Sequence, residues 1–221
     1  REAERLNGLG HHVAWRFDPN LSGGGEFPWM MDHGPHLFAT AWYLARNLPI
    51  ERVSALPRKR GIGGEARLRG ISALTWLYEG EETDGVWVQT ETPPEASEHI
   101  GFRTEVVGDV GILRVFGEGG GAAPGIPQPS PIRVTSNGKV REFDPNDGED
   151  RSWVSNVNYY DRAHANALSH FAESVLDGSE LRYSGEDGKR EVATTLAAIK
   201  SAIDGHSMTV NEVPGDWTAY T

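Results

Sequence analysis

Hydrophobic positions repeat with a helical period near the start of the chain. Apolar residues recur every three or four positions, at Leu37, Ala41, Leu44 and Leu48. This spacing predicts a helix over about 31–47 with one apolar face. Because proline is tolerated in the first turn of a helix and disrupts its interior, we expect the helix to start very close to Pro35.

Two further helices are expected in the last third of the chain. The first covers 159–177 and ends before Gly178, and its apolar stripe consists of Ala163, Ala167, Phe171 and Val175. The second follows Ser184, which forms the S-x-x-D pattern of a capping box with Asp187, and it ends at Gly205. Its buried stripe is expected to consist of Val192, Leu196, Ile199 and Ile203.

Between the first and second helices the pattern changes to that of strands. Segments rich in Val, Ile, Trp, Phe and Thr predict strands over 71–78, 85–90, 100–107, 110–116, 132–135 and 139–143, and shorter ones over 53–56 and 208–213. Asn137-Gly138 predicts a two-residue hairpin, Asp109 marks another tight turn, and the glycines and prolines of 117–131 predict a long loop. This order predicts an α+β fold, with an open, mostly antiparallel or mixed sheet of about six or more strands and helices on one face.

Composition excludes several classes of function. The 221 residues carry 21 Lys+Arg against 32 Asp+Glu, a formal net charge of −11, which argues against binding to nucleic acid or to an anionic membrane. The absence of cysteine excludes disulfides and thiolate metal sites. We expect a cytoplasmic protein with neither a nucleic-acid nor a membrane partner. Because the first residue is Arg1 rather than Met, we also expect a piece of a longer protein.

The candidate chemistry lies between residues 23 and 36. Three consecutive glycines, 23–25, precede Asp32, Gly34 and His36. Residues four apart share a helical face, and a carboxylate beside an imidazole fixes the tautomer of the ring and raises its basicity, as a general base requires. Gly34 lets the backbone approach a ligand closely. The alternative is that Asp32 only caps the helix and that His36 is an ordinary core histidine.

A metal site is a second interpretation of the same segment. Its oxygen and nitrogen donors suit zinc, manganese or iron, and they are Asp32, His33 and His36 with Glu26, His11 or His12. The spacing differs from H-E-x-x-H and no second ligand cluster is obvious, so we expect no metal.

Two motifs near opposite ends of the chain resemble those of the Gfo/Idh/MocA oxidoreductases, the relatives of glucose–fructose oxidoreductase and inositol dehydrogenase. The first is G-G-G-x-x-x-x-x-x-D-x-G-x-H, from Gly23 to His36, followed by an apolar helix. The second, over 171–210, is Phe, an apolar helix, Gly, a strand, S-G-E-D-G, a long helix with Ala and Ser, Gly and a last strand. The strand-rich middle of the chain fits the open sheet of that family.

The resemblance implies that residues 1–221 form a single C-terminal domain for substrate binding and oligomerisation, whose N-terminal Rossmann domain, absent from this chain, binds most of an NAD or NADP cofactor. Asp32 and His36 would be catalytic, His36 taking the hydroxyl proton of a sugar, inositol or related polyol while hydride leaves the same carbon. Gly34 would approach the cofactor. The residues expected to contact substrate are Trp15, Arg16, His33, Tyr160 and His164. Trp15 and Arg16 precede the glycine loop, where relatives often place substrate-contacting side chains, and the alternative is an ordinary strand edge. Tyr160 and His164 could reach the pocket from the start of the second helix, and the alternative is a solvated helix face. The family's open sheets commonly pack face to face, which implies a homo-oligomer.

Several features depart from the family pattern. The family's Glu-Lys-Pro motif does not occur, neither 8–10 nor 61–64 forms a dinucleotide fingerprint, and Ala39 stands where many members have Asp. We expect the 221 residues alone to be inactive. Two other functions remain open: a non-catalytic binding or assembly module of the same fold, and a metal-dependent sugar-processing enzyme.

Overall fold

The computed structural model describes residues 15, 18, 21–58, 70–80, 84–88, 103–116, 132–143 and 159–210. The side chains of 103, 116 and 159–163 are not part of this description. The chain divides into two units, one formed by 1–91 with 183–221 and the other by 92–182. The loop expected over 117–131 lies outside the described residues.

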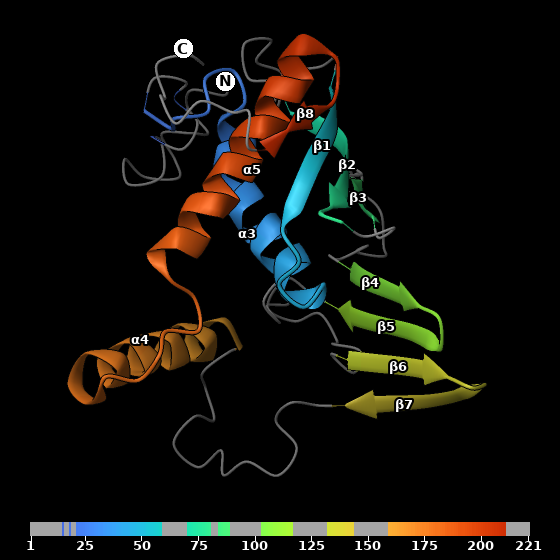
Figure 1. Ribbon diagram of the computed structural model, residues 1–221, viewed down its shortest axis with the longest axis vertical. Coiled ribbons are helices and arrows are strands. Elements are labelled where there is room, and N and C mark those ends of the chain that lie inside the picture. The colour runs from blue at the N-terminus through green and yellow to red at the C-terminus, as the bar shows by residue number, and fades with distance from the viewer. Residues whose placement is uncertain are drawn as a thin grey trace, which may run out of the picture. The chain divides into compact units, whose positions relative to one another are not determined.

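The described residues of the first unit form a four-stranded antiparallel sheet with two helices on one face. The sheet order is β3-β2-β1-β8, and its strands are β1 (Ile50–Pro57), β2 (Ile71–Tyr78), β3 (Asp84–Val88) and β8 (Met208–Thr209). The helices are α3 (Pro28–Leu44) and α5 (Gly185–Asp204), which pack against each other beside β1 (Figure 1). Strand β2 alternates in burial: Leu74 and Trp76 face the helices, and Thr75 and Leu77 face away.

Helix α3 begins earlier than its sequence predicts. Pro28 occupies its first turn, so that Pro35, expected close to the start, lies inside the helix. The steric reason is Gly34: the clash that keeps the residue before proline out of the α region involves its Cβ, which glycine lacks. Phe27, fully buried, stands at the N-cap and anchors the start of the helix in the core.

Helix α5 is capped as expected, but its buried face is rotated. The Ser184 and Asp187 side chains form both bonds of a capping box, and Gly205 closes the helix in the left-handed conformation with φ 75°. Of the expected stripe, Leu196 and Ile199 are buried, whereas Ile203 is 51% exposed. The buried face instead includes small and polar residues: Glu191, Thr194, Thr195, Ala198, Ser201 and Ala202.

Among its described residues, the second unit contains an antiparallel sheet and one helix. Its sheet order is β4-β5-β6-β7, from β4 (Arg103–Gly108), β5 (Gly111–Phe116), β6 (Ile132–Ser136) and β7 (Lys139–Phe143). The expected hairpin at Asn137 and Gly138 is confirmed, because both residues have positive φ, 51° and 72°, as its turn type requires. Helix α4 (Tyr159–Asp177) has the predicted bounds, and the side chains of Phe171 and Val175 are exposed.

The α+β class and the order of elements are therefore confirmed. The expected sheet of six or more strands is instead two sheets of four, because β3 and β4 share no ladder among the described strands. The described strands differ by one to three residues at their ends from most of the predictions. The predicted residues 89–90, 100–102 and 211–213 lie outside the described part of the chain.

Candidate functional site

The glycine-rich loop fixes the start of α3 by close packing. Gly24 is buried, and a Cβ there would lie 2.6 Å from the carbonyl oxygen of Phe27 and 2.8 Å from Cβ of Met31. The Phe27 amide donates to the carbonyl oxygen of Gly24 at 2.9 Å. The loop therefore turns directly into α3, and the first turns of this helix carry the candidate residues.

The side chains of Asp32 and His33 lie close together on the second turn of α3. Nδ1 of His33 lies 3.2 Å from Oδ2 of Asp32, and the side chains are 33% and 17% exposed. Trp29, one turn earlier, stacks on the imidazole with ring centroids 3.7 Å apart and planes 23° apart. A carboxylate, an imidazole and an indole are thus held together at one end of the helix.

His36 is separate from this cluster. It is exposed, and its carbonyl oxygen accepts a hydrogen bond from Thr40 Oγ1 at 2.9 Å. Within the described part of the chain, no ion pair or hydrogen bond joins its ring to Asp32, although the four-residue spacing predicted a shared face. The catalytic roles of Asp32 and His36 remain predictions.

Gly34 lies at the crossing of α3 and α5. The residue is buried, and a Cβ there would lie 2.6 Å from Cε of Met30 and 2.7 Å from Cγ2 of Thr195. The two helices therefore approach closely at this point because position 34 has no side chain. The predicted contact of Gly34 with a cofactor remains a prediction.

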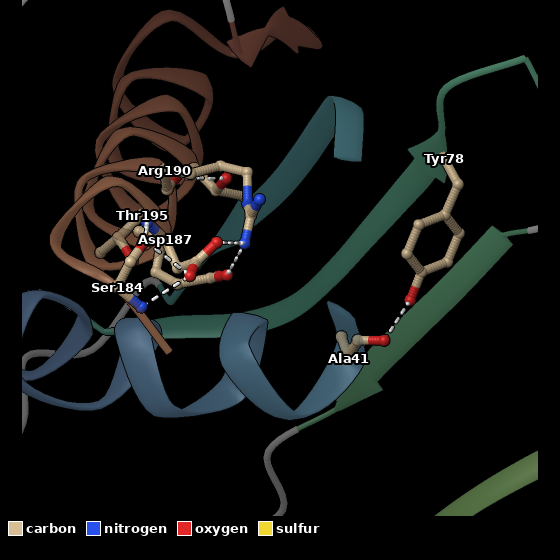
Figure 2. A network of polar contacts seen from close by, with 8 residues as sticks. Ala41, Tyr78, Ser184, Asp187, Arg190 and Thr195 are labelled. Atoms are coloured by element: carbon tan, nitrogen blue, oxygen red, sulfur yellow. Dashed lines mark hydrogen bonds and ion pairs between the residues drawn. The ribbon is translucent and has the colours of Figure 1, made fainter. Parts of the chain in front are cut away.

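A polar network that the sequence did not indicate joins α5 to the C-terminal half of α3. Nη2 of Arg190 lies 3.3 Å from Oδ1 of Asp187 (Figure 2) and 3.3 Å from Oε1 of Glu191. The guanidinium of Arg190 also lies 3.9 Å from the ring centroid of Trp42. Tyr78 on β2 donates its hydroxyl to the carbonyl oxygen of Ala41 at 3.0 Å (Figure 2).

Burial and hydrogen bonding shift the pKa values of the two carboxyl groups in this network in opposite directions. Glu191 is 2% exposed, and burial raises its pKa, a shift that Arg190 opposes. The Ser184 backbone amide and hydroxyl lower the pKa of Asp187. The spacing that could have indicated this face is that of Glu191, Thr195, Ala198 and Ala202, a helical stripe of small residues with one carboxylate.

The remaining predicted substrate contacts are spread over both units. Trp15 is 46% exposed in the first unit, and Arg16 lies outside the described residues. Tyr160 and His164 lie near the start of α4 in the second unit, where His164 is exposed. Their contact with substrate remains a prediction.

Two features of the described residues bear on a metal site and on a membrane partner. No three His, Asp or Glu side chains in the described ranges gather closely enough to hold a metal ion, and His11 and His12 lie outside those ranges. No helix in the same part of the chain is long and apolar enough to cross a membrane.

The fold is similar to that of solved oxidoreductases of the Gfo/Idh/MocA type. An inositol dehydrogenase homologue complexed with NAD+ from Azotobacter vinelandii is 18% identical with a TM-score of 0.64, and the match covers 93% of this chain and 54% of that chain. Aldose-aldose oxidoreductase from Caulobacter crescentus, complexed with glycerol, is 20% identical with a TM-score of 0.61, over 88% of this chain and 50% of that chain.

A third similar structure is an oxidoreductase from Agrobacterium radiobacter in complex with NAD+, L-tartaric acid and magnesium. It is 18% identical with a TM-score of 0.56, over 80% of this chain and 48% of that chain. The chain thus spans about half the length of these proteins. No protein-family model matches the chain, and no curated protein matches its sequence.

Proposed function

We propose that the chain is the C-terminal substrate domain of an NAD(P)-dependent oxidoreductase that acts on a sugar, inositol or related polyol. The observation that carries the proposal is the start of α3, where Asp32, His33 and the exposed His36 supply a carboxylate and two imidazoles. The likeness in fold to an NAD+-complexed inositol dehydrogenase homologue and to an aldose-aldose oxidoreductase supports the same class of reaction.

The described residues fit proton transfer better than nucleotide binding. Gly34, the one expected cofactor contact, is enclosed by Met30 and Thr195. We therefore assign most of the nucleotide binding to a second, Rossmann-type domain, as the half-length match to NAD+-complexed oxidoreductases suggests. A bound NAD(P) would supply the acceptor for the hydride that leaves the alcohol carbon.

In this mechanism His36 takes the proton of the substrate hydroxyl, since it is exposed and its ring is not engaged by Asp32. Asp32 orients the substrate by accepting hydrogen bonds from neighbouring hydroxyls, and Trp15, Arg16 and His33 of the same unit further hold the substrate. The cytoplasm is the compartment that the proposal implies.

The complete gene product tests this proposal. We expect it to reduce NAD+ or NADP+, followed at 340 nm, with at least one member of a panel of aldoses, inositols and alditols. His36→Gln is expected to lower kcat ~10²–10⁴-fold, the usual contribution of a general acid–base group. Asp32→Asn, which weakens the orientation of the substrate, is expected to lower kcat ~10²-fold. If turnover stays within tenfold in both variants, the proton-transfer assignment is wrong, and a binding or assembly module becomes the better function.

The outer face of the first sheet supports self-association. Opposite the helices, this face carries exposed apolar side chains: Leu56, Leu77, Val86 and Val88. In one row across it, Arg52 pairs in register with Leu77 and Leu77 with Asp84, so opposite charges flank an apolar centre. A second copy packed face to face, related by a two-fold axis along β2, would set Arg52 against Asp84 of its partner at both ends of the row. We propose this homodimer as the form of the enzyme.

A further inference from the structure

We propose that His170 is a pH-sensitive latch on the hinge between the two units, closed when its ring is neutral and open when the ring is protonated. The hinge is the connector 178–184 between α4 and α5, and the boundary between the units falls between Arg182 and Tyr183. The latch goes beyond the reaction assigned above and does not depend on it.

Successive residues at this boundary are held by different helices. The Arg182 amide donates to Nε2 of His170 on α4 at 3.1 Å. The Tyr183 ring packs edge-on against Trp42 of α3, with centroids 6.3 Å apart, and Ser184 caps α5. While all three anchors hold, the connector can bend only between Arg182 and Tyr183.

The bond to His170 fixes the rest of the connector. Residues 178–183 are exposed, and Gly178 leaves α4 in the left-handed conformation with φ 71°. Within the described part of the chain, residues 179–182 make no other hydrogen bond. Exposed segments with few contacts open at little cost, so loss of this bond lengthens the hinge to the whole stretch after Gly178.

Only one form of the imidazole can accept this bond. A neutral ring with its proton on Nδ1 presents a lone pair on Nε2, whereas a protonated ring carries N–H groups on both nitrogens. Protonation would set the N–H of Nε2 against the amide N–H of Arg182. Histidine is the side chain that ordinarily changes charge between about pH 5 and 8, so the latch opens as pH falls through that range.

The ring of His170 has one polar partner in the described ranges, the Arg182 amide. The charged residues that follow His170 on α4 are Glu173 and Asp177, and those of the connector are Glu180 and Arg182. In the same ranges, none of their side chains forms an ion pair or hydrogen bond with the imidazole. Protonation of the ring therefore acts directly on the latch.

Hydrogen exchange of the complete gene product measures the latch at the Arg182 amide. Mass spectrometry at pH 8 and pH 5, corrected for the chemical exchange rate, reports the protection of peptides over 178–184, and peptides over 71–78 serve as the internal reference for a folded chain. We expect the Arg182 amide to be protected ~3–10-fold more at pH 8 than at pH 5, as the loss of one hydrogen bond implies.

Two substitutions at position 170 separate the acceptor from its titration. His170→Leu removes the acceptor, and we expect the Arg182 amide to lose this protection at both pH values. His170→Gln supplies an amide oxygen that accepts and does not titrate, so it should protect at both. His164→Gln, at an exposed position of the same helix, is the matched control and should behave like the wild type.

Three results would overturn the latch. One is equal protection of the wild type at both pH values, and another is wild-type protection in His170→Leu. The third is a loss of protection in His170→Gln at pH 5 as large as that of the wild type, because the pH effect would then come from another group.

Discussion

The close crossing of α3 and α5 at Gly34 predicts the effect of adding a single methyl group. In Gly34→Ala the new Cβ would lie 2.6 Å from Cε of Met30, and 2.7 and 2.8 Å from Cγ2 and Oγ1 of Thr195. Favourable contacts between carbon atoms occur at ~3.5–4.0 Å, so these neighbours must move by about 1 Å. Met30 ends in a flexible thioether, but Thr195 is fully buried and its hydroxyl donates to the carbonyl oxygen of Glu191 at 2.8 Å.

The magnitude follows from two opposing effects. Overpacking of a core costs ~1–3 kcal/mol, and alanine gains ~1 kcal/mol over glycine in the interior of a helix. That gain is reduced at position 34, because a Cβ on the residue before Pro35 disfavours the α conformation. We therefore expect Gly34→Ala to lower the free energy of unfolding by ~2 kcal/mol.

Urea unfolding followed by tryptophan fluorescence measures this loss. Gly188→Ala on α5 is a matched control, because a Cβ there would meet only Tyr183, at 3.8 Å. It should be neutral or stabilise by up to ~1 kcal/mol. Adding Thr195→Ala to Gly34→Ala should remove part of the loss, since both Thr195 atoms in the clash disappear. If Gly34→Ala matches the control, or if the two losses simply add, the close-approach argument is refuted.

Three other perturbations follow from the structure. Because burial raises the pKa of Glu191 above its unfolded value, the contribution of Glu191 to stability is present at low pH and lost as pH rises. Urea unfolding at pH 4 and pH 7 should show that the wild type loses stability relative to Glu191→Gln as pH rises. A difference in the free energy of unfolding that stays constant between the two pH values would contradict this. Ser184→Ala removes the cap of α5 and should lower the free energy of unfolding by ~1 kcal/mol in the same assay at pH 7, whereas no change would mean that the capping box contributes nothing. In sedimentation experiments Arg52→Asp and Asp84→Arg should each weaken the proposed dimer and the double exchange should restore it; unchanged association in the single variants would exclude that face.

Local signals in the sequence predicted the local structure well. Asn137-Gly138 specifies its hairpin through positive φ at both residues, and Ser184 with Asp187 specifies the start of α5. These features depend on residues a few positions apart, which the sequence displays directly. The predicted bounds of α4 depend on the same kind of short-range pattern.

Features that depend on distant residues were harder to predict. The buried face of α5 contains Glu191 and Thr195, residue types that usually indicate a surface, and they are buried because Gly34 brings α3 close. The division of the strands into two sheets depends on pairing across the chain rather than on the pattern of any one strand.

Within the candidate site, the sequence indicated the residues but not their partners. Asp32, His33 and His36 were singled out from residue type and spacing, and the four-residue rule favoured Asp32 with His36. The stack of Trp29 on His33 brings the neighbouring imidazole to Asp32 instead. Spacing alone could not show that contact, because it depends on the rotamer that His33 adopts when its ring stacks on Trp29.

The position of Pro35 has a mechanical consequence for α3. A proline cannot supply the amide that would bond the carbonyl oxygen of residue 31, so the helix is weakest to bending between its second and third turns. Asp32 and His33 lie before that point and His36 lies after it. A small change in the bend would therefore alter the separation of the two imidazoles while every side chain keeps its rotamer.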